Sequence, residues 1–310
     1  GPFIKTYLSA KSLSQVDKTV FSPTTQIRNV TSASTFALAA GHVGNGASLK
    51  EAMYFIFKDV FTKNGIYDDA VTARKMNEYL EEGVINSSMV LKEIEFLVKD
   101  SLKGNPKIYN TADLISHLYD TKTVTKLMDI YRAGDDLWKV YGYEYEKSLK
   151  TQAIRSLDDV TDYFRRVFNR EFDADAYSKE VMSKFNPISK SHVISSEELL
   201  APAIRQISSE VIKNVYPNYS YVPKIIQEMR RMPYGNFISF PAEMYRTQAN
   251  LLRYGFKEMT SSNALIRQQG ARRLMGLSTA LYLPFGAAEL GKFMYEITND
   301  QSDRFQRSFA

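Results

Sequence analysis

Hydrophobic residues recur along this chain at the three- and four-residue spacing of amphipathic helices, and period-two alternation is nearly absent. Three apolar stripes show the helical spacing most clearly. They are Val90, Ile94, Leu97 and Val98; Ile154, Leu157, Val160, Phe164 and Phe168; and Ile204, Ile207, Val211, Ile212 and Val215. The pattern predicts an all-α protein, a bundle-like or orthogonal array of at least eight helices without a substantial sheet.

Polar and small residues predict where the helices begin and end. Capping boxes at Ser48–Glu51 and Ser195–Glu198 mark two starts, because a hydroxyl and a carboxylate there can satisfy free backbone N–H groups. Breaks are expected where Gly, Pro and Asn gather, at 41–46, 64–65, 104–106, 186–187, 216–218 and 233–236. The stretch 111–150 has only Gly134 and Gly142 as weak points, so it forms either one helix or two joined by a kink.

Composition along the chain suggests three regions. Residues 1–46 are expected to be an extended segment with a glycine-rich turn, 47–223 a helical core region, and 224–310 a basic helical region packed on it. Residues 1–223 hold 28 basic and 28 acidic side chains, whereas 224–310 hold 12 basic and 7 acidic ones, so the last region carries the whole net charge of +5. Because Gly1-Pro2 resembles the remnant left by a tag-removing protease, we expect one continuous module of a larger protein.

Several kinds of catalytic chemistry find no support in the residues. The chain has no cysteine, which excludes disulfides, thiolate metal sites and cysteine nucleophiles. Its three histidines, His42, His117 and His192, are too far apart in the sequence for a short-range zinc motif. The glycine-rich stretch 41–46 lacks the Gly-Lys-Ser/Thr of a phosphate loop and is predicted as a turn. We therefore expect no enzyme, with no catalytic, metal or cofactor-binding residue and no cofactor.

The densest acidic group lies among aromatic residues. Asp135 and Asp136 are followed by Trp138, and then by Glu144 and Glu146. Paired carboxylates can bind a divalent cation. Adjacent residues of a helix point in different directions, however, which favours a solvated face or ion pairs between helices.

Basic residues of the last region are the candidate contact residues. Arg246, Arg253 and Lys257 are spaced by seven and four, which places them along one side of a helix that begins near Pro241. The full candidate set is Arg246, Arg253, Lys257, Arg267, Arg272 and Arg273. Arginine neutralises phosphates, and the nearby Tyr245 and Tyr254 could stack on bases. The spacing fits nucleic acid, lipid headgroups or an acidic protein surface, and does not choose among them.

Fifteen uncharged residues, 274–288, follow Arg273. A helix that spans a membrane needs about 20 apolar residues, so this stretch is short for a span. Small residues such as Gly276 and Ala280 would let another helix approach closely, and Pro284 would interrupt the segment. It is expected to be either a buried core helix or a helix that meets a membrane or a partner in another state.

Several blocks of the sequence resemble one group of proteins. The segment 232–246, MPYGNFISFPAEMYR, and the segment 18–31, KTVFSPTTQIRNVT, carry most of the resemblance, together with 134–139 and 214–219. These blocks are similar to a helical domain of bacteriophage large polyvalent proteins, which are internal virion proteins of the ejection type. The matching signature positions, whose role is expected to be structural, are Arg28, Asn29, Pro233, Gly235, Asn236, Pro241 and Glu243.

The resemblance implies a non-enzymatic structural module that works in genome delivery or in organising the capsid interior. Its implied partners are other virion proteins or other domains of the parent chain, with DNA and, on ejection, the host membrane as further candidates. The implied location is the virion interior, and after ejection the host envelope or cytoplasm. Two alternatives stay open: a nucleic-acid-binding module, and an accessory domain of a virion-carried polymerase or cell-wall hydrolase whose active site lies elsewhere.

The signature also has a physical explanation in the residues themselves. Pro233 and Gly235 interrupt one helix, and Asn236 can cap the next. Glu243 lies near the start of that helix, where a negative charge is favourable, and Arg246 follows three residues later. The sequence therefore predicts a Glu243–Arg246 ion pair on one helix face.

Overall fold

The computed structural model describes residues 33–62, 70–85, 122–185, 195–218, 239–282 and 292. Of these residues 84% are helical, in nine helices, and none lies in a strand. The prediction of an all-α protein is confirmed. The stripe at 90–98 and the breaks expected at 64–65, 104–106, 186–187 and 233–236 lie outside the described residues.

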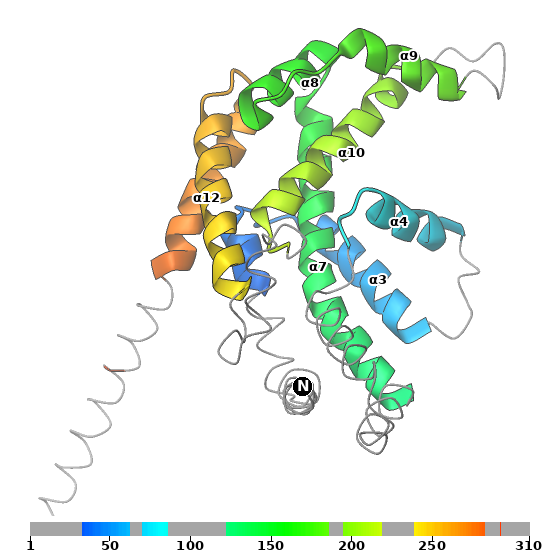
Figure 1. Ribbon diagram of the computed structural model, residues 1–310, viewed down its shortest axis with the longest axis vertical. Helices are drawn as coiled ribbons and strands as arrows, with labels where there is room; N and C mark the ends of the chain where they lie inside the picture. The colour runs from blue at the N-terminus through cyan, green and yellow to red at the C-terminus, as the bar shows by residue number, and fades with distance from the viewer. Residues whose placement is uncertain are drawn as a thin grey trace, which may run out of the picture.

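The long helix α7 (Lys122–Ala153) forms the axis of the molecule (Figure 1). Helices α3 (Gly46–Thr62) and α10 (Ser196–Val215) pack along it, and α4 (Ala70–Glu81) contacts α3. α7 passes through Gly134 and Gly142 without a break, so between 122 and 150 the alternative of one continuous helix is correct. At Gly142 a Cβ would lie 2.8 Å from the Tyr216 hydroxyl and 2.9 Å from His42 Nδ1, so only glycine leaves room for these two side chains.

The chain then turns over the end of α7. Helix α8 (Leu157–Tyr163) begins at a capping box made by Ser156 and Asp159. It continues into a π-helical turn, Phe164–Phe168, and α9 (Ala174–Phe185) follows. The stripe predicted at 154–168 is buried except for the half-buried Leu157, but it runs through a link, a helix and a π-helical turn rather than one helix.

The last described helices form an antiparallel hairpin at one edge of the molecule, drawn in yellow and orange in Figure 1. They are α12 (Ser239–Met259) and the helix 264–282, joined by four residues. A Cβ at Gly270 would lie 2.6 Å from the carbonyl oxygen of Gly255, so the lack of side chains at both positions lets the two backbones approach closely. Leu251, Tyr254 and Leu277 of this hairpin belong to the same hydrophobic core as α7 and α10.

The described part of the first region, 33–46, departs from the expected extended segment. Residues 33–39 form a helix, and the turn predicted at 41–46 follows it. Its small side chains Ala37, Ala39 and Ala40 are buried in the core. A Cβ at Gly276 would collide with the carbonyl oxygen of Leu38, so glycine is needed where the helix 264–282 crosses this segment.

One of the two predicted capping boxes is correct. Ser195 and Glu198 form the expected box at the start of α10, and all five members of the 204–215 stripe are buried. The box at Ser48 is wrong, because α3 begins at Gly46 and the side chain of Asn45 accepts a hydrogen bond from the Ser48 N–H at 3.1 Å. Asparagine is as good an N-cap as serine, and it lies three residues earlier.

Candidate functional site

The last turns of α7 direct two charged side chains into the protein interior. Glu146 and Lys150 are four residues apart and therefore share a helix face. Both side chains are 0% exposed, and Lys150 Nζ donates to Glu146 Oε2 at 3.1 Å. An isolated charge at such a depth would destabilise the fold by several kcal/mol. Both groups therefore require further partners.

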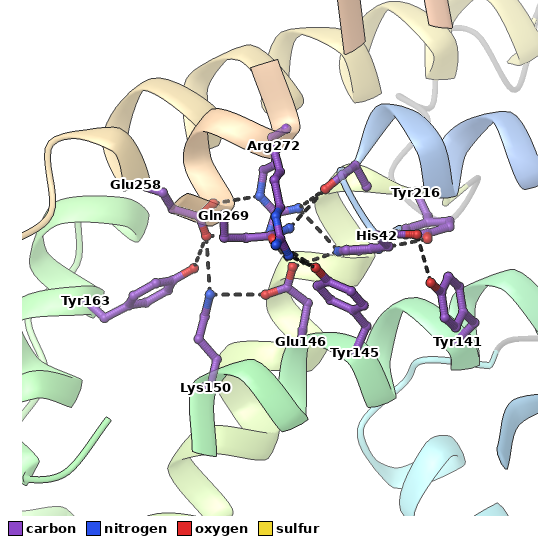
Figure 2. Close-up of polar contacts among 12 residues, drawn as sticks. His42, Tyr141, Tyr145, Glu146, Lys150, Tyr163, Tyr216, Glu258, Gln269 and Arg272 are labelled. Atoms are coloured by element: carbon purple, nitrogen blue, oxygen red, sulfur yellow. Dashed lines mark hydrogen bonds and ion pairs between the residues drawn. The ribbon is translucent and has the colours of Figure 1, made fainter. Parts of the chain in front are cut away.

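The hairpin supplies the partners (Figure 2). Arg273 of the helix 264–282 donates to Glu258 Oε2 at 2.7 Å and to the Glu146 carboxylate. Lys150 reaches Glu258 Oε1 at 3.4 Å. All four side chains are 0% exposed. Two cations and two carboxylates form a closed group whose charges balance, and we call these four residues the buried network.

Neighbouring charges keep two members of the network, Glu146 and Arg273, ionised. Burial alone would raise the pKa of Glu146, but Arg273 and Lys150 outweigh burial and hold that pKa well below its ordinary value. Burial likewise disfavours the charged guanidinium, yet Glu146 and Glu258 raise the pKa of Arg273. Glu146 and Arg273 thus depend on the opposite charges around them to remain ionised inside the protein.

His42, in the turn after the helix 33–39, attaches to the network in neutral form. Burial lowers its pKa, and the neighbouring Glu146 reverses this only in part. Nε2 lies 2.7 Å from Glu146 Oε1, and Nδ1 lies 2.9 Å from the Tyr216 hydroxyl. Because the Glu146 carboxylate can only accept, we assign the proton to Nε2, which donates to Glu146, while Nδ1 accepts from Tyr216.

Hydroxyl and amide groups complete the shell around these charges. Tyr163 donates to Glu258 at 2.7 Å, and Tyr141 donates to the backbone carbonyl of His42 at 2.9 Å. Gln269 and Arg273 both donate to the carbonyl oxygen of Ala40, at 3.2 and 3.0 Å. The site therefore joins four parts of the chain: the turn at 40–42, α7, α12 and the helix 264–282.

The arrangement is suited to holding helices together. In this conformation no solute reaches the four charged groups, because none of them exposes any surface. Within the described part of the chain, no three His, Asp or Glu side chains are grouped so that they could hold a metal ion. Ion pairs and hydrogen bonds between helices are the chemistry that the geometry itself provides.

The predicted Glu243–Arg246 pair is confirmed. Arg246 Nε lies 2.9 Å from Glu243 Oε2, and the buried Glu243 also accepts from the Asn218 N–H at 2.6 Å. Arg246 donates in addition to the carbonyl oxygens of Lys213 and Tyr216, at 3.2 and 3.4 Å. The guanidinium thereby caps the C-terminal end of α10, where a cation is favourable.

The other signature positions are less informative. Arg28, Asn29, Pro233, Gly235 and Asn236 lie outside the described residues. Pro241 is exposed in the first turn of α12, which begins two residues before the expected start. Proline is tolerated there because N–H groups in the first turn of a helix have no backbone acceptor. The N–H that proline lacks therefore costs no hydrogen bond.

The six basic candidates do not lie on one exposed surface. Arg273 lies in the buried network, and Arg246 is engaged in capping α10. The half-buried Arg272 donates to the Tyr145 hydroxyl at 2.7 Å. Arg272 and Arg273 point in different directions because they are adjacent on a helix.

The three remaining basic candidates stay at or near the surface. Arg253 and Arg267 are exposed, and Lys257 is half-buried with its Nζ 3.3 Å from the Val167 carbonyl oxygen. Burial and the nearby Arg253 both lower the pKa of Lys257. These three residues are the ones from the predicted set that a partner could reach.

Glu144, a member of the acidic-aromatic group, forms an ion pair between helices. This is one of the two alternatives predicted for that group. Glu144 accepts from Lys75 at 3.0 Å and from the Tyr79 hydroxyl at 2.9 Å, both on α4. Asp135 instead pairs within α7, with Lys139 at 2.6 Å. Glu146 belongs to the buried network.

Sequence reasoning missed His42, Lys150 and Glu258 as members of a common site. His42 and Glu146 are 104 residues apart, and Glu146 and Arg273 are 127 apart, so no local spacing connects them. One signal was present: Glu146 and Lys150 share a helix face in a stretch dense in tyrosine.

The uncharged segment 274–288 is only partly described. Residues 274–282 belong to the last helix of the hairpin, where Leu277 is buried and Met275 is exposed. No described helix is both long enough and apolar enough to cross a membrane.

Together, the fold and the site define an all-α protein whose helices are fastened by a closed, charge-balanced interior network. Comparison with protein-family models, with curated proteins and with solved structures gives no match for this chain.

Proposed function

We propose that this chain is a non-catalytic structural module of a phage virion-internal protein, with a role in genome delivery or in organising the capsid interior. The observation that carries the structural part is the buried network. Its four ionisable side chains lie on α7, α12 and the helix 264–282, and they expose no surface. The phage assignment is supported by the sequence blocks at 18–31 and 232–246.

A charged interior suits a module that must keep one arrangement of helices. Apolar side chains pack in many similar ways, whereas Arg273 satisfies Glu146, Glu258 and the Ala40 carbonyl only in one geometry. Such a module can present fixed surfaces to other virion proteins or to other domains of a parent chain. Its role is to hold and place partners.

The location can be tested on virions that carry this chain. Particles are opened by osmotic shock, and the DNA and internal proteins are separated from the emptied shells. Quantitative mass spectrometry of both fractions should find the chain with the released contents. If the chain stays with the outer shell, or is absent from purified particles, the proposal is contradicted.

Binding of nucleic acid is the second candidate function. In the described part of the last region, the two acidic residues Glu243 and Glu258 are both buried, so the exposed charges there are basic. Arg253 and Arg267 supply exposed charge. Their replacement by glutamine should weaken DNA binding and reduce the slope of log affinity against log salt by about 2.

A matched pair of substitutions separates this candidate from general charge effects. Lys179 and Lys184 are also exposed, but they lie on α9, away from the hairpin in Figure 1. Glutamine at these two positions changes the net charge equally. Equal losses of affinity in both double variants would contradict a specific surface on the hairpin.

Two further hypotheses from the sequence stay predictions. Contact with the host membrane predicts binding to anionic liposomes that disappears when Leu281, an exposed residue, is replaced by aspartate. An accessory role in a virion-carried polymerase or hydrolase predicts that the parent protein, and not this chain alone, turns over nucleotides or peptidoglycan.

A further inference from the structure

The hairpin of α12 and the helix 264–282 exposes large apolar side chains on the side that faces away from the core. Each is between 40% and 79% exposed. We call the following six residues the outer face: Tyr245, Leu252, Phe256 and Met259 of α12, with Met275 and Tyr282 of the helix 264–282. Single exposed apolar residues are ordinary, but a group of them on one face marks a contact surface.

The outer face is continuous because of how the two helices pair. On each helix its members are separated by three, four or seven residues, so they share one side of that helix. The opposite sides of both helices are buried in the same core. Gly255 lies against Leu274 and Gly270, and this antiparallel contact places Tyr245 at the level of Tyr282. The outer face is therefore two helices wide.

The charges beside the outer face are basic. Arg253 is exposed and Lys257 is half-buried, and each follows directly after an apolar member of the face. The acidic residues of the described hairpin, Glu243 and Glu258, are both buried. A complementary partner is thus apolar where it meets the two helices and negatively charged beside them.

We propose that the outer face rests on the surface of a lipid bilayer that contains anionic headgroups. A helix with an apolar side and neighbouring basic residues typically lies in the plane of a membrane surface, with its apolar side chains among the acyl chains. Arginine and lysine can extend from such a helix to the headgroups. Because the other sides of both helices are held in the core, only the outer face can enter lipid. Membrane contact, predicted so far from segment 274–288, is thereby assigned mainly to α12.

Two other occupants fit this face less well. Two copies of the chain that met through it would bring their Arg253 and Lys257 side chains into one interface, and like charges oppose such contact. A nucleic acid would neutralise the basic residues, but its phosphates and sugars offer Leu252 and Met275 no apolar environment. A bilayer satisfies both the apolar and the basic side chains.

Sedimentation of the full chain with phosphatidylcholine vesicles, with and without phosphatidylserine, tests the contact. The chain should bind the vesicles that contain phosphatidylserine. Leu252→Ser with Phe256→Ser should weaken this binding at least about tenfold, because apolar area no longer enters the lipid. The control is Val71→Ser with Leu80→Ser, two exposed residues of α4, which lies away from the hairpin in Figure 1. All four residues are exposed, so circular dichroism should show an unchanged fold.

A second pair of variants tests the basic residues. Arg253→Gln with Lys257→Gln should weaken binding to the phosphatidylserine vesicles about 25-fold, at about fivefold for each charge near an anionic surface. Lys179→Gln with Lys184→Gln on α9 changes the net charge equally and should have a much smaller effect.

The absence of cysteine in the sequence allows a label to be placed on the outer face. Ala249 is exposed and lies one turn from both Tyr245 and Leu252. A polarity-sensitive fluorophore on Ala249→Cys should shift to shorter wavelength on the vesicles and be quenched by spin-labelled lipid. The same fluorophore on Met53→Cys, an exposed position of α3, should show neither change.

The proposal is overturned if the chain does not bind the phosphatidylserine vesicles, if the two serine variants bind equally, or if the fluorophore at position 249 stays in water. A dimer of the chain that Leu252→Ser with Phe256→Ser dissociates would assign the face to a second copy instead, and a loss of DNA binding in that variant would assign it to nucleic acid. The fractionation of virions tests the phage assignment separately, so either proposal can fail without the other.

Discussion

Replacement of Arg273 by methionine tests the buried network most severely. Arg273 is 0% exposed and binds the carboxylates of Glu146 and Glu258. Methionine keeps much of the apolar volume but removes the charge, and Lys150 is then the remaining cation of the network. One negative charge stays buried without a partner, which costs about 3–5 kcal/mol. The lost bond to the Ala40 carbonyl adds about 1 kcal/mol.

A loss of about 4–6 kcal/mol is large beside the roughly 5–15 kcal/mol that stabilises a typical domain. It can be measured by urea denaturation followed by circular dichroism at 222 nm. Arg165→Met is the matched control, because the Arg165 side chain is 71% exposed in its pair with Asp162. Surface pairs of this kind contribute about 0–1 kcal/mol.

A second substitution separates charge balance from the loss of packing. Glu146→Gln in the Arg273→Met background leaves Lys150 and Glu258 as a neutral pair. The double variant should therefore be more stable than the sum of the two single effects predicts, by about 2 kcal/mol. Strict additivity, or a loss below about 1 kcal/mol in Arg273→Met alone, would refute the reasoning.

Three further predictions concern other parts of the structure. Glu243→Ala leaves Arg246 without its carboxylate in a partly buried site and should cost about 3–5 kcal/mol; an unchanged thermal melt would contradict this. Gly276→Ala places a methyl group against the Leu38 carbonyl and should cost about 1–3 kcal/mol or more, whereas Gly46→Ala, which has open space around it, should be tolerated; equal melting temperatures would be the contrary result. Because burial lowers the pKa of His42 from 6.5, the unfolded state takes up its proton first as pH falls, so stability should decline below that pH by at most about 1.4 kcal/mol per unit. His42→Gln should lack this component, and identical pH dependence in the two proteins would disprove it.

Local features of the fold could be predicted from the sequence because they depend on neighbours along the chain. The capping box at Ser195, the buried stripe of α10 and the Glu243–Arg246 pair all join residues within about one turn of helix or one apolar face. The helix at 33–39 was missed. Its place in the fold involves the crossing with the helix 264–282, where Gly276 lies against the backbone of Leu38 and Ala39, and this is a tertiary contact.

The site could not be predicted, because its members meet only in the folded chain. Helical spacing correctly placed Arg272 and Arg273 in one segment, but it does not say which of the two faces the core. That choice depends on Glu146 and Glu258, which lie 127 and 15 residues away along the chain. Charged residues are expected at the surface unless they are paired, so the burial of Arg273 follows from its partners and not from its own type.

The account rests on an interior network that is closed to water, and the ionisation of His42 reports on it most directly. An NMR titration of the ring protons, assigned by comparison with His42→Gln, should show a midpoint below pH 6.5, because burial outweighs the attraction of Glu146. A midpoint at or above 6.5 would mean that the ring is solvated or carries a charge, and would contradict a closed, charge-balanced network.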